Sequence, residues 1–264
     1  MKRLPLTILF PVLLLAGASC SVKEDRDVCP AQLVVCLDRV PTPLRDSPLR
    51  LEIRSEDRAV HWRSDVLPAD GPVRMRVPRG NVRIDAVWDS ESLPSAKSVF
   101  QTSGTEADSL FAYVANISCF SESVSDTVYL HKQWCNLTLK LLHPEIWEGY
   151  HMEICGRWNG LDLETLTPIP GQMRIQPKRV SMDTYQARIL RQGDDGLNMQ
   201  IFDGDKGPDP VASIPLGEMM RMNGYDWTDE DLPDVTLTID PTQATIEVDI
   251  APWDESTPFG EITI

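Results

Sequence analysis

The chain has 264 residues, of which 42% are hydrophobic, enough for one large core or two ordinary ones. Its formal net charge at pH 7 is −15, from 40 acidic and 25 basic side chains. An acidic surface repels phosphate backbones and anionic headgroups. The composition therefore argues against nucleic acid as a partner and against purely electrostatic attachment to a membrane.

The N-terminus has the pattern of a secretory signal peptide. Two basic residues precede an apolar run over residues 4–16, and small residues lead to Cys20. The run is shorter than the roughly 20 residues that a membrane span needs. A signal that ends at a cysteine resembles a bacterial lipoprotein signal, in which the cysteine becomes the mature N-terminus and carries acyl chains. We predict a signal peptide over residues 1–19 and a lipidated acidic tether over residues 20–30; ordinary secretion with an incidental cysteine is the alternative.

Beyond the tether, the dominant pattern is alternation of apolar and polar residues with period two. Alternation of this kind predicts strands with one face on a core and one face in water. Turn residues such as Gly, Asp and Pro separate the segments. The segments with this pattern are LRLEIR (49–54), VRMRV (73–77), NVRIDAV (81–87), TVYLH (127–131), NLTLKL (136–141), YHMEI (150–154), YQARI (185–189), NMQIF (198–202), VTLTI (235–239) and ATIEVDI (244–250).

Many short strands with frequent turns predict an all-β fold of two β-sandwich domains. We place the boundary near Gln133, which gives an N-terminal sandwich over residues 31–132 and a C-terminal one over residues 133–264. We expect one helix, in PLGEMMRMNG (215–224), where an Asn-Gly pair would stop it. The segment 106–117 fits a helix or a strand equally well. The last two alternating segments are joined by residues 240–243, which predicts a hairpin.

No motif of an enzyme or a metal site is present in the sequence. The four histidines (His61, His131, His143, His151) show no ligand spacing, and His131 and His151 have the parity of solvated residues. There is no nucleophile signature. DGDKGPDP (203–210) fails as an EF-hand loop, because Pro208 and Ile214 stand where Gly and Glu are required. We therefore expect no catalytic activity, no cofactor and no metal.

Cysteine and tryptophan each leave two interpretations open. Five cysteines follow Cys20, an odd number with no C-x-x-C spacing, so some are free. Strand parity places Cys135 in the core and Cys155 outside, and these two are therefore predicted not to form a disulfide. The seven tryptophans could stack on sugars or fill cores.

Three stretches resemble one known family, the FimB/Mfa-like fimbrial anchor subunits of Bacteroidales. The resemblance rests on CSVKEDRDVCP from residue 20, on VPRGNVRIDAVWDS from residue 77, and on IPLGEMMRMNGYDWTDEDLPDVTLTID from residue 214 with the later IEVDIAPWDE. It spans residues 20 to about 255. It implies two transthyretin-like β-sandwich domains in tandem after a lipoprotein signal peptide.

The resemblance also implies a function and its residues. The chain would be a surface-exposed lipoprotein of the outer membrane, held by lipid on Cys20, that anchors a fimbria and pairs with pilin subunits by strand addition. Glu24, Asp25 and Asp27 would form a surface-export signal; a solvated flexible tether is the other explanation for them. A glycan-binding surface lipoprotein of the same fold is the alternative function.

Overall fold

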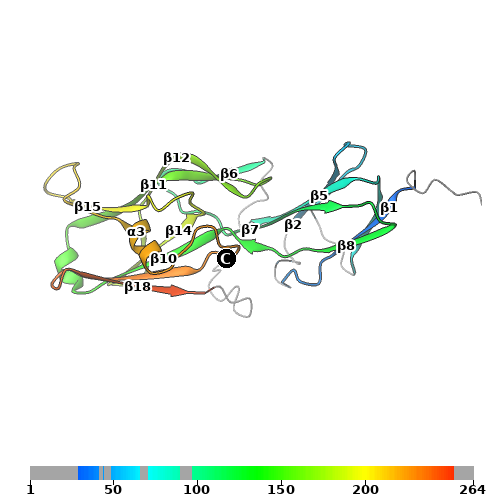
Figure 1. Cartoon of the computed structure of the whole chain (residues 1–264). Helices are drawn as coiled ribbons and strands as arrows, with labels where there is room; N and C mark the ends of the chain where they lie inside the picture. Colours follow the sequence, from blue (N-terminus) through cyan, green and yellow to red (C-terminus); the bar gives the residue numbers. More distant parts are fainter. Residues whose placement is uncertain (1–28, 42–43, 45–48, 66–70, 90–96, 253–264) are drawn as a thin grey trace, which may run out of the picture.

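The computed structural model describes residues 29–41, 44, 49–65, 71–89 and 97–252. Those residues form four β-sheets arranged as two units, and Figure 1 shows the units end to end, with the chain entering at β1 on the right. Within the described residues, helices are too short or too polar to cross a membrane.

Two sheets form the N-terminal unit. Sheet 1 has the order β4-β1-β8 and sheet 2 the order β3-β2-β5-β7-β9. Their inward residues, from Ala31 to Val128, form one buried core. The strands are β1 (Ala31–Cys36), β2 (Leu49–Ser55), β3 (His61–Ser64), β4 (Val73–Val77), β5 (Asn81–Asp89), β7 (Leu110–Ser118), β8 (Ser123–Thr127) and β9 (His131–Lys132).

Two further sheets form the C-terminal unit around a second core. Sheet 3 has the order β13-β14-β10-β17-β18, and sheet 4 the order β12-β11-β15-β16. The 3-10 helix η3 (Pro144–Trp147) and the helix α3 (Leu216–Met222) complete the unit. The strands are β10 (Trp134–Leu141), β11 (Tyr150–Asp162), β12 (Thr167–Ile175), β13 (Lys178–Arg179), β14 (Thr184–Leu190), β15 (Asn198–Asp203), β16 (Ala212–Ile214), β17 (Asp234–Asp240) and β18 (Thr245–Ala251).

Nine of the ten alternating segments form strands, as their patterns predict. In β10, Leu137, Leu139 and Leu141 are buried between more exposed polar neighbours, because side chains on a strand alternate between faces. The all-β fold is confirmed, and so are the strands of the predicted hairpin, whose Asp240 side chain accepts hydrogen bonds from the turn residues. α3 ends before Gly224, which has φ +93° as a helix stop requires. Most of the ambiguous segment 106–117 is a strand, β7 (Leu110–Ser118), and residues 106–109 precede that strand.

The prediction of one strand over TVYLH (127–131) is wrong. β8 ends at Thr127 and β9 begins at His131, so the chain passes from sheet 1 to sheet 2 between them. The Val128 N–H donates to the Cys36 carbonyl at 3.0 Å, and its side chain is buried. The alternation of apolar and polar residues therefore continues where the chain changes sheets, and the pattern alone cannot reveal such a change.

One strand, β6 (Ser98–Phe100), lies in the sequence between strands of the N-terminal unit but pairs with a strand of the C-terminal unit. It comes before Gln133 and pairs antiparallel with β11, with Phe100 opposite Gly160. A Cβ at Gly160 would lie 2.6 Å from the Phe100 ring, so the absence of a side chain at Gly160 leaves room for the ring. Residues 97–109, called the crossing segment below, therefore lie on the C-terminal unit before β7 returns the chain to sheet 2.

Candidate interaction surfaces

The strand that follows the predicted tether lies in the middle of its sheet. β1 is antiparallel to β4 and parallel to β8. The Gln32 N–H donates to the Glu122 carbonyl at 2.8 Å near one end, and the Cys36 carbonyl accepts from Val128 at the other. Ladder hydrogen bonds run across the strand direction, so two ladders at once resist a pull along β1.

Arg79 holds the chain just before β1 on the fold. Its Nε donates to the Cys29 carbonyl at 3.0 Å, and its Nη1 donates to the Phe120 carbonyl. Arg79 belongs to the turn between β4 and β5, so its guanidinium joins the chain just before β1 to the loop before β8. The N-terminal end of the fold is therefore held by side-chain hydrogen bonds as well as by the sheet.

A buried apolar cluster joins the two units. Trp134, Leu161, Leu163 and Leu190 come from the C-terminal unit, and Val87, Leu110 and Ala112 come from the N-terminal unit; Ala107 lies in the crossing segment. The Gln133 N–H donates to the Leu110 carbonyl across this cluster at 3.0 Å. A shared apolar cluster removes its area from water only while the units stay together, so it opposes their separation.

A polar link on the surface reinforces the same junction. Glu164, in the turn between β11 and β12, accepts from Arg54 Nη2 at 2.9 Å and from Lys97 Nζ at 2.8 Å. Those two cations lower the pKa of Glu164, Lys97 most strongly. Its backbone carbonyl also accepts from Arg83, and Arg54 and Arg83 both reach Asp85. This set, Arg54, Arg83, Asp85, Lys97 and Glu164, is called the surface link below.

A second polar link is buried. Lys132 is fully buried at the end of sheet 2, and its ammonium bonds to Asp234 and lies 4.3 Å from the centre of the Trp134 ring. Asp234 also accepts from the Asn136 N–H at 2.8 Å. Arg191 donates to Gln133 Oε1 at 2.9 Å and to the carbonyls of Trp227 and Glu230. Two pairs cross between the units, Lys132 with Asp234 and His131 with Asp231, and Arg191 holds Gln133, the residue after Lys132, on the C-terminal unit. Lys132, Asp234, His131, Asp231 and Arg191 are called the buried link below.

His131 is not the solvated histidine that its parity suggested. Its Nδ1 lies 3.0 Å from Asp231 Oδ2, and this hydrogen bond raises the pKa of His131. Burial alone would raise the pKa of Asp231, but the hydrogen bonds from His131 and from the Lys132 N–H bring it below its ordinary value. The expectation failed because Asp231 comes from the other unit, 100 residues along the chain.

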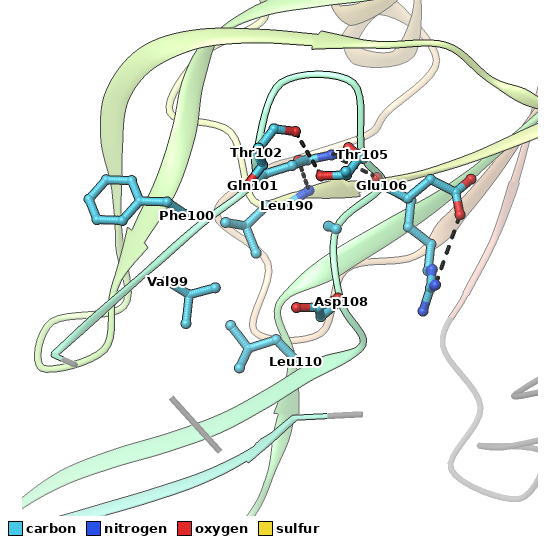
Figure 2. Close-up of a pocket in the computed structure, with 11 residues that line it drawn as sticks. Val99, Phe100, Gln101, Thr102, Thr105, Glu106, Asp108, Leu110 and Leu190 are labelled. Carbon is cyan, nitrogen blue, oxygen red and sulfur yellow. Dashed lines mark hydrogen bonds and ion pairs between the residues drawn. The ribbon is translucent and has the colours of Figure 1, made fainter. Parts of the chain in front are cut away.

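A pocket of about 490 Å³ opens beside the crossing segment (Figure 2). Val99 and Phe100 lie on one side of it and Glu106 on the other. The buried Gln101 amide donates to the carbonyls of Thr105 and Arg188, at 3.0 and 3.3 Å. The Gln101 side chain thus holds the crossing segment on β14, and its amide N–H groups are used in stabilising the fold.

The sheet edges differ in how they are protected. An exposed edge is open to pairing with another chain unless it is short, interrupted by proline or charged. β9 and β13 have two residues each, β16 three and β3 four, and β12 contains Pro168 and Pro170. The longer edges without proline are β4 and β8, with five residues each, and β18, with seven.

The predicted anchor and export residues, Cys20, Glu24, Asp25 and Asp27, lie outside the described residues. The cysteines that follow are free, from Cys29 to Cys155. Cys135 is fully buried, and burial raises its pKa to about 12. Cys155 lies on the opposite face of β11 from Met152 and Ile154, as its parity predicted.

The described tryptophans are placed mainly in the interior. Trp88, Trp134 and Trp227 are buried, and Trp62 and Trp147 pack partly buried against the two cores. Trp158 is partly buried and lies against Gly193. These positions favour packing over sugar stacking for the tryptophans that the structure describes.

No family model matches the sequence, and no curated protein matches it either. Solved structures do match. A candidate polysaccharide-binding protein from Bacteroides thetaiotaomicron has a TM-score of 0.56 at 11% identity, over 86% of this chain and 99% of that one. The fimbrial anchor protein Mfa2 from Porphyromonas gingivalis has 0.53 at 12%, over 85% and 98%. A candidate adhesin from Bacteroides ovatus has 0.55 at 13%, over 85% and 94%.

The match covers both units in each case and nearly the whole of the other chain. At 11–13% identity, it is a likeness of fold. It agrees with the resemblance seen in the sequence motifs, which came from short stretches and not from the fold. The chain has the two-unit β fold of the FimB/Mfa-like fimbrial and adhesin proteins of Bacteroidales.

Proposed function

We propose that the chain is a structural subunit of a fimbria, held on the outer membrane by lipid on Cys20 and exposed on the cell surface. The observation that carries the proposal is the position of β1. It follows the predicted tether directly, lies in the middle of sheet 1, and is joined to the rest of the unit by two ladders, with Arg79 holding the chain just before it. A protein that holds a polymer to a membrane needs such a connection between its tether and its core.

The fold supports the proposal at a coarser level. Mfa2, which has the same fold, is a fimbrial anchor protein, and other proteins of this fold are candidate adhesins. The role is mechanical and not catalytic: pilin subunits pair with the chain by strand addition, which uses unpaired N–H and C=O groups at a sheet edge. Glu24, Asp25 and Asp27 direct the lipoprotein to the surface.

Replacement of the anchor cysteine tests the attachment. Cys20→Ser should move the protein from the detergent phase to the aqueous phase, because acyl chains supply the membrane affinity. Cys29→Ser is the matched control and should stay in the detergent phase. Pilins should co-purify with the detergent-solubilised wild type. Retention of Cys20→Ser in the membrane would disprove the lipid anchor, and absence of pilins from the purified protein would disprove the fimbrial role.

The export signal has a separate test. The triple variant Glu24→Ala, Asp25→Ala, Asp27→Ala should remain in the membrane fraction but become inaccessible to protease added to intact cells. Asp205→Ala with Asp209→Ala, in an exposed loop, is the control and should remain accessible. Unchanged accessibility of the triple variant would leave these residues as a solvated tether.

Glycan binding is the second candidate function, and the pocket beside the crossing segment offers it a place. Polar side chains of Thr102, Thr105 and Glu106 line the pocket, and the Phe100 ring next to it is 57% exposed. Small-ligand sites combine apolar surface with a few polar groups in this way. Retention on immobilised polysaccharide that is lost in Glu106→Ala would support this function, and free passage through the column would end it.

A further inference from the structure

Among the described residues, no strand pairs with the outer edge of β18, which leaves a defined set of open backbone groups there. The Leu142 N–H donates to the Ile239 carbonyl at 2.9 Å, so Ile239 directs its backbone groups to the β10 side of β17. In an antiparallel pair, residues alternate between facing the partner and facing away. Ile239 is opposite Ile246, and it follows that Ile246, Val248 and Ile250 direct their N–H and C=O groups away from β17.

The outer edge of β4 can be assigned in the same way. The Gln32 N–H donates to the chain that leads into β8, so Gln32 faces β8 and Leu33 faces β4. Leu33 is opposite Met75, whose backbone groups therefore bond to β1. Arg74 and Arg76, on either side of Met75, direct their N–H and C=O groups to the open edge.

The side chains of these two edges are complementary. In β4 the pattern is V-R-M-R-V, with Arg74 and Arg76 exposed. In β18 the central pattern is I-E-V-D-I, with Glu247 and Asp249 exposed. Neither these arginines nor these carboxylates form an ion pair with another side chain among the residues that the structure describes. On the other face, both strands present partly or fully buried apolar residues to their cores.

The direction of pairing follows from the backbone. In an antiparallel pairing the bonded groups of Arg74 and Val248 would face each other, which would place an arginine on the apolar face. In a parallel pairing, a residue that faces its partner strand lies beside one that faces away. Parallel pairing therefore places Arg74 beside Glu247 and Arg76 beside Asp249, on the solvent face.

The parallel register satisfies every open group between its ends. The N–H groups of Arg74 and Arg76 donate to the carbonyls of Ile246 and Val248, and the carbonyls of the two arginines accept from Val248 and Ile250. Val73, Met75 and Val77 then continue the apolar face. Parallel pairs already occur once in each unit, between β1 and β8 and between β10 and β17.

We propose that β18 of one molecule pairs in parallel with β4 of a second copy of this chain. The two edges belong to different units, so the contact joins unlike surfaces, and repetition of it extends head to tail. Opposite charges directly across neighbouring strands stabilise a sheet, and like charges destabilise it. The proposal concerns contacts between copies and does not depend on the lipid or on pilin binding.

Charge reversal tests the contact with two variants of the full-length chain in detergent. One is Arg74→Glu with Arg76→Glu, and the other is Glu247→Arg with Asp249→Arg. Each variant alone should associate roughly tenfold or more weakly than the wild type, measured by sedimentation over a concentration series. An equimolar mixture of the two variants should recover association, because each edge then meets its opposite charge.

The four side chains are exposed. The circular dichroism spectrum and the thermal midpoint of each variant should therefore match those of the wild type. This measurement distinguishes loss of the contact from loss of the fold. Asp205→Arg with Asp209→Arg, in an exposed loop, is the control for a change of net charge and should associate as the wild type does. A wild type that stays monomeric at every concentration would overturn the proposal and would mean that the charges protect the edges. Variants that associate like the wild type, or a mixture that fails to recover, would overturn it as well.

Discussion

The surface link and the buried link join the same two units but differ in their physical basis. Glu164 of the surface link is about a third exposed, and Lys97, one of its partners, is 71% exposed. In the buried link Lys132 is fully buried and Arg191 is 7% exposed, while the Asp234 carboxylate is 37% exposed. Exposed ion pairs contribute little, because water and salt screen them, whereas loss of one partner of a buried pair leaves a charge that water cannot reach. Similar residue types at one junction should therefore differ several-fold in their contribution to stability.

Removal of the carboxylate of the buried link should have the largest effect. Asp234→Ala removes the carboxylate that bonds to the fully buried Lys132 ammonium, although the Asp234 side chain itself is 37% exposed. We expect the free energy of unfolding to fall by about 2–4 kcal/mol, at or below the range for pairs with both partners buried, because water reaches the Asp234 carboxylate. Urea denaturation followed by circular dichroism measures it. Asp205→Ala, in an exposed loop, should change it by less than about 0.5 kcal/mol. A loss below about 1 kcal/mol for Asp234→Ala would place this pair in the same class as surface pairs.

Loss of the Arg191 guanidinium should rank second. Arg191→Leu removes the donors to the Gln133 side chain and to the carbonyls of Trp227 and Glu230. Unsatisfied buried acceptors cost about 1–3 kcal/mol, and we expect a loss of that size in urea denaturation. The control is Arg157→Leu. The Arg157 side chain pairs with the Asp194 carboxylate but is 72% exposed, so water can replace its contacts. Equal losses for the two arginines would contradict the comparison.

The surface link should respond weakly and in a salt-dependent way. Glu164→Ala removes the acceptor shared by Arg54 and Lys97, and we expect a loss of about 1 kcal/mol or less at low salt. In about 1 M NaCl the loss should shrink further, because exposed charges are screened. Asp234→Ala should keep most of its effect under the same conditions. If salt leaves the loss for Glu164→Ala unchanged, solvent exposure does not determine how much this link contributes to the free energy of unfolding.

The pair of His131 and Asp231 should give the smallest effect and a dependence on pH. The folded pKa of His131 lies above its unfolded value of about 6.5, so its contribution is complete below that value and is lost as the pH rises through the folded pKa. The folded pKa of Asp231 is lowered, so its own contribution is present above about pH 4 and is lost on acidification.

The difference in unfolding free energy between wild type and His131→Gln should therefore be larger at about pH 6 than at about pH 9, by up to about 1 kcal/mol. Urea denaturation at the two pH values measures this difference. His61→Gln, at a side chain that is 61% exposed, is the control for the substitution itself and should change the unfolding free energy by less than about 0.5 kcal/mol. A difference that grew with pH would mean that His131 is neutral in the folded protein.

Residues at the junction show why part of the structure could not be predicted. Lys132 and Asp234 are 102 residues apart, and nothing in the spacing of either residue indicates that they meet. The same holds for Glu164 and Arg54, 110 residues apart. The strands themselves could be predicted, because a buried face imposes its period on consecutive residues. The hairpin of β17 and β18 could be predicted as well, because its turn is local.

The sequence by itself determined the elements: alternation defined most strands, and Asn223-Gly224 ended the helix. The lipoprotein interpretation of the cysteine-ended signal stays a prediction. Parity within a strand also placed Cys135 inside and Cys155 outside. Only the tertiary structure decided which strands share a sheet, that β6 crosses to β11, that TVYLH changes sheets, and that His131 meets Asp231. The reason is that side-chain period is a property of consecutive residues, whereas pairing, parallel direction and ion pairs depend on residues that only folding brings together.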